Sequence, residues 1–250
     1  MSSFTERWNK LQKAFESSGD DEWWAMVFAR PLANVFLLPI ADIRWITPNL
    51  LTWFAFVLGI VGIGLMFSAD YMLMIWGVAV IQIRCVVDSM DGHLARYRGG
   101  GSAAGAYLDK ATDALFWTVL FMSLAYAAYR QDPNPVYFML AGVAAFSRLF
   151  IGYVYWLNHY MQLQVDPDRK ARAHTYRYSP TTIKGWLWNF LYMFNMAEPD
   201  MYFWISIGII FNRLDILMWF LGISNGGIAL IRLLQRGRSA LMLDKSSAKS

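Results

Sequence analysis

The sequence predicts an all-α membrane protein in which six transmembrane helices follow N-terminal interfacial amphipathic helices. Of the 250 residues, 57% are hydrophobic and 16% are charged, whereas a soluble domain has roughly 45–50% and 25%. Several apolar runs approach the ~20 residues that cross a bilayer. This composition excludes a disordered chain, a collagen-like fibre and an ordinary soluble enzyme. Cys85 is the only cysteine, so no intrachain disulfide can form.

The N-terminal region, residues 1–46, is predicted to lie at the membrane surface rather than to cross it. Apolar residues recur at helical spacing over residues 4–15, with charged residues between them. This pattern is typical of an interfacial helix, or of a soluble helix packed on the protein. Residues 25–41 are apolar, but Pro31 and Pro39 interrupt them, so we expect a second surface segment there.

Six apolar segments follow and are predicted to cross the membrane. Their approximate bounds are 50–67, 72–90, 103–129, 136–158, 186–211 and 216–234. They form a membrane domain over residues 47–238, which a polar cytosolic tail, 239–250, follows.

The fifth segment is interrupted by Glu198-Pro199-Asp200. If 186–211 is one span, the two acids lie within the membrane and face a substrate cavity. Alternatively, residues 186–197 lie on the membrane and the span starts at Asp200, which makes Glu198 and Asp200 interface charges.

The charge distribution predicts the topology. The chain has 22 Lys and Arg residues and a formal net charge of +4, yet the three predicted outer loops contain only Arg130 and Arg213. Positive residues concentrate on the cytosolic side of membrane proteins, so both termini and the inner loops are predicted to be cytosolic. We therefore interpret the basic surplus as membrane anchoring, and we expect no nucleic-acid partner.

Four aspartates lie close together between Asp88 and Asp113. Asp88 and Asp91 are three residues apart at the inner end of the second predicted span, and Asp109 and Asp113 are four apart at the start of the third. On helices, both spacings place the two carboxylates of a pair on one face. A glycine-rich turn at 99–101 joins the spans, so the four carboxylates converge near the cytosolic surface.

These carboxylates together would carry about four negative charges in a partly desolvated place, so they need cations or protons. Two divalent cations would balance the charge, and oxygen ligands suit Mg²⁺, Mn²⁺ or Ca²⁺. A metal pair held by acids is typical of displacement at phosphorus. The alternative is a divalent-cation transporter that uses the aspartates as its ion site.

Three neighbouring residues favour a phosphate ligand. Gly92 and Gly105 lack a Cβ and allow a bulky ligand to approach the backbone. Arg96 can bind a phosphate through two parallel hydrogen bonds.

Two arginines within the predicted spans are further candidates. Arg84 precedes Asp88 by four residues, and either pairs with it or contacts the donor phosphates. Arg148 lies about 18 Å along the fourth span from its outer end. At this depth it either lines an acceptor or phosphate site or forms a structural ion pair.

The spacing within this stretch resembles the signature of the CDP-alcohol phosphotransferases. Every fixed position of the signature is matched, by Asp88, Asp91, Gly92, Ala95, Arg96, Gly105, Asp109 and Asp113. The first predicted span also opens like the family's Pro-Asn-x-x-Thr pattern, with Pro48, Asn49 and Thr52. The six-span plan extends the resemblance to most of the chain from Thr47 onward.

The resemblance implies a homodimeric six-helix membrane enzyme, embedded in membrane lipids, with a cavity that faces the cytosol. Such an enzyme transfers a substituted phosphate from a CDP-linked donor to a hydroxyl acceptor and releases CMP, in phospholipid biosynthesis. Either the donor is lipidic (CDP-diacylglycerol) and the acceptor is small, or the donor is soluble and the acceptor is a lipid alcohol.

The resemblance also implies roles for individual residues. Two ions, Mg²⁺ or Mn²⁺, would be held by Asp88, Asp91, Asp109 and Asp113, and Asp113 would also be the general base. The CDP moiety would contact Asn49, Thr52, Asp88, Gly92, Ala95, Arg96, Ser102 and Gly105.

Overall fold

The computed structural model describes residues 4–16, 22–165, 187, 194 and 196–247, and this part of the chain is helical without strands. The elements are α1 (Phe4–Glu16), the π-helical turn η1 (Ala25–Ala29), α2 (Arg30–Ile40), α3 (Pro48–Phe67), α4 (Tyr71–Tyr97), α5 (Ala103–Gln131), α6 (Val136–Val165), α8 (Glu198–Ile210) and α9 (Leu214–Ser247). The predicted all-α class is confirmed.

Five of the described helices, α3, α4, α5, α6 and α9, are long and apolar enough to cross a membrane. The count of six is not confirmed. Helix α8 has 13 residues and is about 20 Å long, whereas the hydrocarbon core is about 30 Å thick. Most of residues 186–197 lie outside the described residues, so a fifth crossing over 186–211 stays a prediction.

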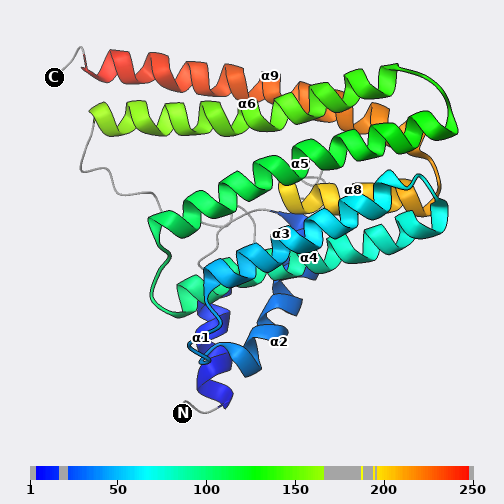
Figure 1. Ribbon diagram of the computed structural model, residues 1–250. Helices are drawn as coiled ribbons and strands as arrows, with labels where there is room; N and C mark the ends of the chain where they lie inside the picture. Colours follow the sequence, from blue (N-terminus) through cyan, green and yellow to red (C-terminus); the bar gives the residue numbers. More distant parts are fainter. Residues whose placement is uncertain (1–3, 17–21, 166–186, 188–193, 195, 248–250) are drawn as a thin grey trace.

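The helices form two long pairs, α3 with α4 and α6 with α9, and α5 lies between them (Figure 1). Helices α3 and α4 are antiparallel, whereas α6 and α9 both begin at the same end of the bundle and run parallel. Helix α3 packs along α4, and α6 packs along α9; α5 contacts α3 on one side and α6 on the other. Helix α8 lies against α4 and α9. Helix α9 has 34 residues, so it is longer than the hydrocarbon core and continues into the predicted polar tail.

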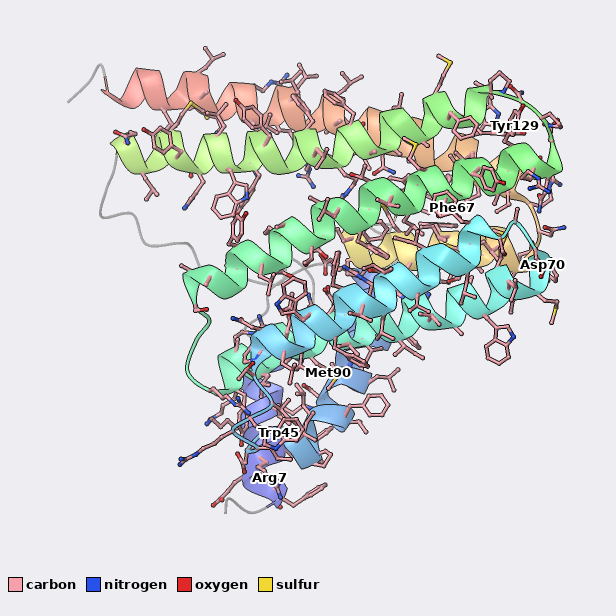
Figure 2. The ribbon with its side chains drawn as sticks, in the orientation of Figure 1. Arg7, Trp45, Phe67, Asp70, Met90 and Tyr129 are labelled. Atoms are coloured by element: carbon pink, nitrogen blue, oxygen red, sulfur yellow. The ribbon has the colours of Figure 1, made fainter. Side chains whose placement is uncertain are left out.

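The three predicted outer loops gather at one end of the bundle. Two hydrogen bonds tie them together: Gln131 Nε2 donates to Asn212 Oδ1 at 2.8 Å, and the Tyr71 hydroxyl donates to the Ile210 carbonyl at 3.0 Å. Figure 2 shows Asp70 at this end and Trp45 toward the opposite one. This grouping agrees with the loop arrangement that the charge pattern predicts.

The N-terminal helices pack against α4 near its C-terminal end. The segment from Ala25 to Ile40 is apolar but shorter than a span, as the sequence predicts. Its prolines do not break it. Pro31 lies in the first turn of α2, where no intrahelical N–H bond is lost, and Pro39 lies inside α2, one residue before the helix ends. Leu11 of α1 is fully buried, so one face of α1 packs on the protein.

Candidate active site

The turn between α4 and α5 brings the two aspartate pairs together. Gly99 and Gly100 have φ values of 102° and 132°, which residues with a Cβ rarely adopt. Helix α5 then begins at a cap in which the Ser102 hydroxyl accepts the Gly105 N–H at 3.0 Å. The chain therefore reverses sharply, and the end of α4 faces the start of α5.

Three of the four aspartates form a cluster. One carboxylate oxygen from each of Asp88, Asp91 and Asp109 lies within 4.8 Å of the others. Oxygens that share one hard divalent cation at 2.0–2.6 Å lie at most about 5 Å apart, so this cluster fits such an ion. The Thr52 hydroxyl donates to Asp91 Oδ2 at 2.5 Å, which holds that carboxylate in place.

The fourth aspartate, Asp113, is buried beside two cations. Its Oδ1 accepts from Arg84 Nη2 at 2.8 Å, and its Oδ2 lies 3.7 Å from Lys110 Nζ. Lys110 also lies 3.1 Å from Asp109 Oδ2. The predicted pair between Arg84 and Asp88 is present but longer, at 3.9 Å. The site thus contains two basic side chains, those of Arg84 and Lys110, that pair with the aspartates. The family signature does not specify either of them.

A first cavity of about 490 Å³ opens beside the cluster, where α3 begins, α4 ends and α5 begins. Its size is within the usual range for small-molecule sites. All the residues predicted to contact CDP line it, apart from Asp88: Asn49, Thr52, Gly92, Ala95, Arg96, Ser102 and Gly105.

Two of these residues connect the cavity wall to other helices. A Cβ on Gly105 would lie 2.8 Å from Asn49 Oδ1 and would displace that side chain, so α5 lies close to the start of α3 here. Arg96 Nε donates to the Ala14 carbonyl at 2.9 Å. The predicted phosphate-binding arginine therefore also connects the cavity to α1.

A second cavity, of about 200 Å³, contains all four aspartates and shares Asp91, Gly92, Arg96 and Asp109 with the first. The N-terminal segment closes one side of it with Glu22, Ala25 and Arg30, and α8 contributes Glu198, Pro199 and Tyr202. This part of the N-terminal segment carries no motif and meets the aspartates only through the fold, so its sequence does not predict a role in the site.

A third cavity, of about 190 Å³, lies between α5, α6 and the start of α8. It shares Lys110, Asp113, Trp117 and Glu198 with the second cavity. The two spaces therefore adjoin at Asp113, and the third cavity leads away from the aspartate cluster.

Arg148 lines the third cavity and also forms an ion pair. Its Nη2 lies 2.7 Å from Glu198 Oε1, and its Nη1 donates to the Met196 carbonyl at 3.0 Å. Asp200 is fully buried and accepts the Trp24 N–H at 2.8 Å. The interpretation of Glu198 and Asp200 as ordinary interface charges is therefore wrong, because one lines two cavities and the other holds the N-terminal segment inside the fold.

Comparison with known families gives the class of this site. Residues 45–211 match the model of the CDP-alcohol phosphatidyltransferase family, and the chain belongs to that family.

Individual relatives narrow the comparison. Over 105 residues the chain is 30% identical to the phosphatidylinositol phosphate synthase of Mycolicibacterium smegmatis; the alignment covers 42% of this chain and 44% of that relative. The fold is similar to the crystal structure of the Mycobacterium tuberculosis phosphatidylinositol phosphate synthase with CDP-DAG bound. The TM-score is 0.54 at 19% identity, covering 84% of this chain and 92% of that chain.

Proposed function

We propose that the protein transfers a substituted phosphate from a CDP-linked donor to a hydroxyl acceptor and releases CMP, in phospholipid biosynthesis. One observation carries the proposal: the aspartate cluster lies at the junction of the cavity lined by the predicted CDP contacts and the cavity that leads to Asp113. A nucleotide in the first cavity would place its diphosphate at the cluster.

Asp88, Asp91, Asp109 and Asp113 are the residues that would hold two divalent cations, Mg²⁺ or Mn²⁺. The cluster of Asp88, Asp91 and Asp109 supports one such ion. When bound, the ions would neutralise charge on the phosphoryl oxygens and on the leaving group.

Asp113 would act as the general base. Asp113 lines both the second and the third cavities, and its Oδ2 is not the oxygen that Arg84 binds. The acceptor hydroxyl would give its proton to this oxygen as it attacks the phosphorus distal to cytidine. A new oxygen–phosphorus bond forms, the bond from that phosphorus to the bridging oxygen breaks, and CMP leaves with the electron pair.

The remaining predicted residues would bind rather than react. Asn49, Thr52, Asp88, Gly92, Ala95, Arg96, Ser102 and Gly105 would hold the CDP moiety. Arg148 would contact the acceptor, or a phosphate, from the third cavity.

The arrangement of substrates has two candidate forms. A lipidic donor with a small polar acceptor is supported by the name of the M. smegmatis relative and by the CDP-DAG in the M. tuberculosis structure. A soluble CDP-linked donor with a lipid alcohol is the second form. We further propose a homodimer with both termini and the active site on the cytosolic side, on the basis of the family resemblance and the loop charges.

CMP release by the purified protein in mixed micelles with Mg²⁺ tests the proposal. Pooled CDP-linked donors and pooled alcohol acceptors would be supplied, and mass spectrometry would identify the lipid product. We expect CMP from the wild type and none above background from Asp113→Asn. The product mass names donor and acceptor together.

A divalent-cation transporter is not favoured, since it does not account for Gly92, Ala95, Arg96 and Gly105. Thermal unfolding distinguishes the two functions. A transferase is stabilised by CDP when Mg²⁺ is present, whereas a transporter is stabilised by the cation alone. The absence of CMP from a folded protein that CDP does not stabilise would contradict the proposed reaction.

A further inference from the structure

We propose that Arg84, held by Tyr202, is a positioning residue that fixes the orientation of the Asp113 carboxylate for proton transfer. The proposal rests on the proposed function and adds to it two residues that the family signature does not specify. Neither is assigned to the metal ions, to CDP or to the acceptor above.

The burial of Arg84 is the first observation. Its side chain is 2% exposed and lies within α4, one helical turn before Asp88. Placing a guanidinium away from water is costly unless opposite charge and hydrogen bonds compensate. A charged side chain at such a place in a membrane-spanning helix indicates a specific use.

The second observation is the set of partners that surrounds the guanidinium. Nη2 donates to Asp113 Oδ1 on α5 at 2.8 Å, and Nη1 bonds to the Tyr202 hydroxyl on α8. The Phe116 ring packs against the group, with the guanidinium carbon 3.7 Å from the ring centroid. Hydrogen bonds and ring stacking on a planar fork leave little rotational freedom.

Space for this arrangement is provided by α3. A Cβ on Gly59 would lie 2.8 Å from the Phe116 ring and 3.1 Å from Arg84 Nε. Helices α3, α4, α5 and α8 therefore meet at this one guanidinium, and they fix it in the direction of Asp113.

Orientation is what Asp113 needs from such a contact. Arg84 binds Oδ1, so Oδ2 is the oxygen that Arg84 does not occupy, and it lies 3.7 Å from Lys110 Nζ. A general base must lie within hydrogen-bond reach of the proton that it removes. A carboxylate free to rotate would spend part of its time with both oxygens misplaced, and a misplacement of about 1 Å costs about 100-fold in rate.

A steady-state comparison of matched variants tests the proposal. We expect Arg84→Gln to lower kcat about 100-fold and Tyr202→Phe, which removes one hydroxyl, to lower it about three- to tenfold. Arg84→Lys keeps the charge but not the planar fork, and we expect it to lie between Arg84→Gln and the wild type. CDP affinity should change less than about twofold in all three variants. The Mg²⁺ concentration for half-maximal activity should not rise, because none of the three substitutions removes a proposed metal ligand.

Gln82→Leu is the matched control. Gln82 also connects α4 to α8, because its Nε2 donates to the Tyr202 carbonyl at 3.2 Å and to the Ser206 hydroxyl at 2.8 Å. It does not line the three cavities described above. We expect a lower melting temperature and an unchanged kcat.

The outcomes separate the two proposals. If the wild type releases no CMP from any donor and acceptor, the proposed function fails. If the wild type is active, a full kcat in Arg84→Gln overturns the positioning proposal. A kcat that falls in Gln82→Leu as far as in Tyr202→Phe also overturns it, because the contact between α4 and α8 would then be structural. If Arg84→Gln does not fold, the comparison of kcat between Tyr202→Phe and Gln82→Leu still tests the positioning proposal.

Discussion

The two sides of Asp113 are built in different ways. On the donor side, the aspartate cluster and the large cavity come from a short stretch of sequence plus the first turn of α3. On the other side, the third cavity is assembled from α5, α6 and α8, and Arg148 reaches Glu198 across 50 positions of sequence. The donor side thus depends on spacing within neighbouring helices, whereas the other side depends on how distant helices pack.

This difference suggests that the donor side determines the reaction and that the third cavity determines which acceptor is used. The donor side contains the residues of the family signature, and we propose that these residues bind the CDP moiety. The third cavity lies outside that pattern and is lined by a half-buried ion pair and aromatic residues such as Trp156. We expect substitutions on the donor side to change the reaction itself, and those in the third cavity to change the use of the acceptor.

The largest expected effect comes from Asp91→Asn. The amide keeps the size of the side chain but removes a negative ligand from the cluster, and we expect turnover to fall about 1,000-fold. CMP release at saturating donor and Mg²⁺ measures it. Asp70→Asn is the matched control, because Asp70 caps the other end of α4 (Figure 2) and Asn caps equally well. Equal losses in the two variants would contradict a site-specific role for Asp91.

A smaller effect on the donor side is expected from Thr52→Val. The substitution removes the hydroxyl that donates to Asp91 and keeps the shape of the side chain. Partners that orient a metal ligand contribute about 10- to 100-fold in metal affinity. We therefore expect the Mg²⁺ concentration for half-maximal activity to rise by about that factor. Ser123→Ala, which removes a buried hydroxyl bonded to the Leu120 carbonyl, should leave the Mg²⁺ dependence unchanged.

The sequence predicts the donor side well, for a physical reason. Helical periodicity places Asp88 with Asp91 and Asp109 with Asp113, and two glycines mark the turn that joins them. Gly105 and Asn49 are both predicted to contact CDP, and the structure adds that they touch each other. Helical spacing therefore predicts which aspartates share a face, and the family resemblance identifies residues that line the first cavity. Neither predicts that Arg84 and Lys110 both contact Asp113.

Local spacing does not predict contacts between elements far apart in the chain. Tyr202 meets Arg84 across 118 positions, and Asp200 meets Trp24 across 176. From the sequence alone, Tyr202 is interpreted as an aromatic residue of an apolar helix and Asp200 as a charge at the membrane interface. The pairing appears only when α8 packs on α4 and on the N-terminal segment.

The third prediction tests the acceptor side through Arg148 and Glu198. Removing either partner leaves a half-buried charge unpaired, which is more disruptive than removing both. We expect Arg148→Gln and Glu198→Gln each to raise the acceptor KM about tenfold, or about 1.4 kcal/mol. The double variant should lose less than the two single effects combined. CDP affinity is the control, and a fall in it would place the pair on the donor side instead.

The smallest expected effect concerns Asp200, which fastens the N-terminal segment rather than lining one of the three cavities. Asn at this position keeps an oxygen that accepts the Trp24 N–H, so Asp200→Asn should unfold at nearly the wild-type temperature. Asp200→Ala leaves the buried N–H without that acceptor and should cost about 1–3 kcal/mol of unfolding free energy. Turnover well below the melting temperature should be unchanged in both. Because Glu22, Ala25 and Arg30 close one side of the aspartate cavity, a loss of turnover in a folded Asp200→Ala variant would instead make the N-terminal segment part of the catalytic site.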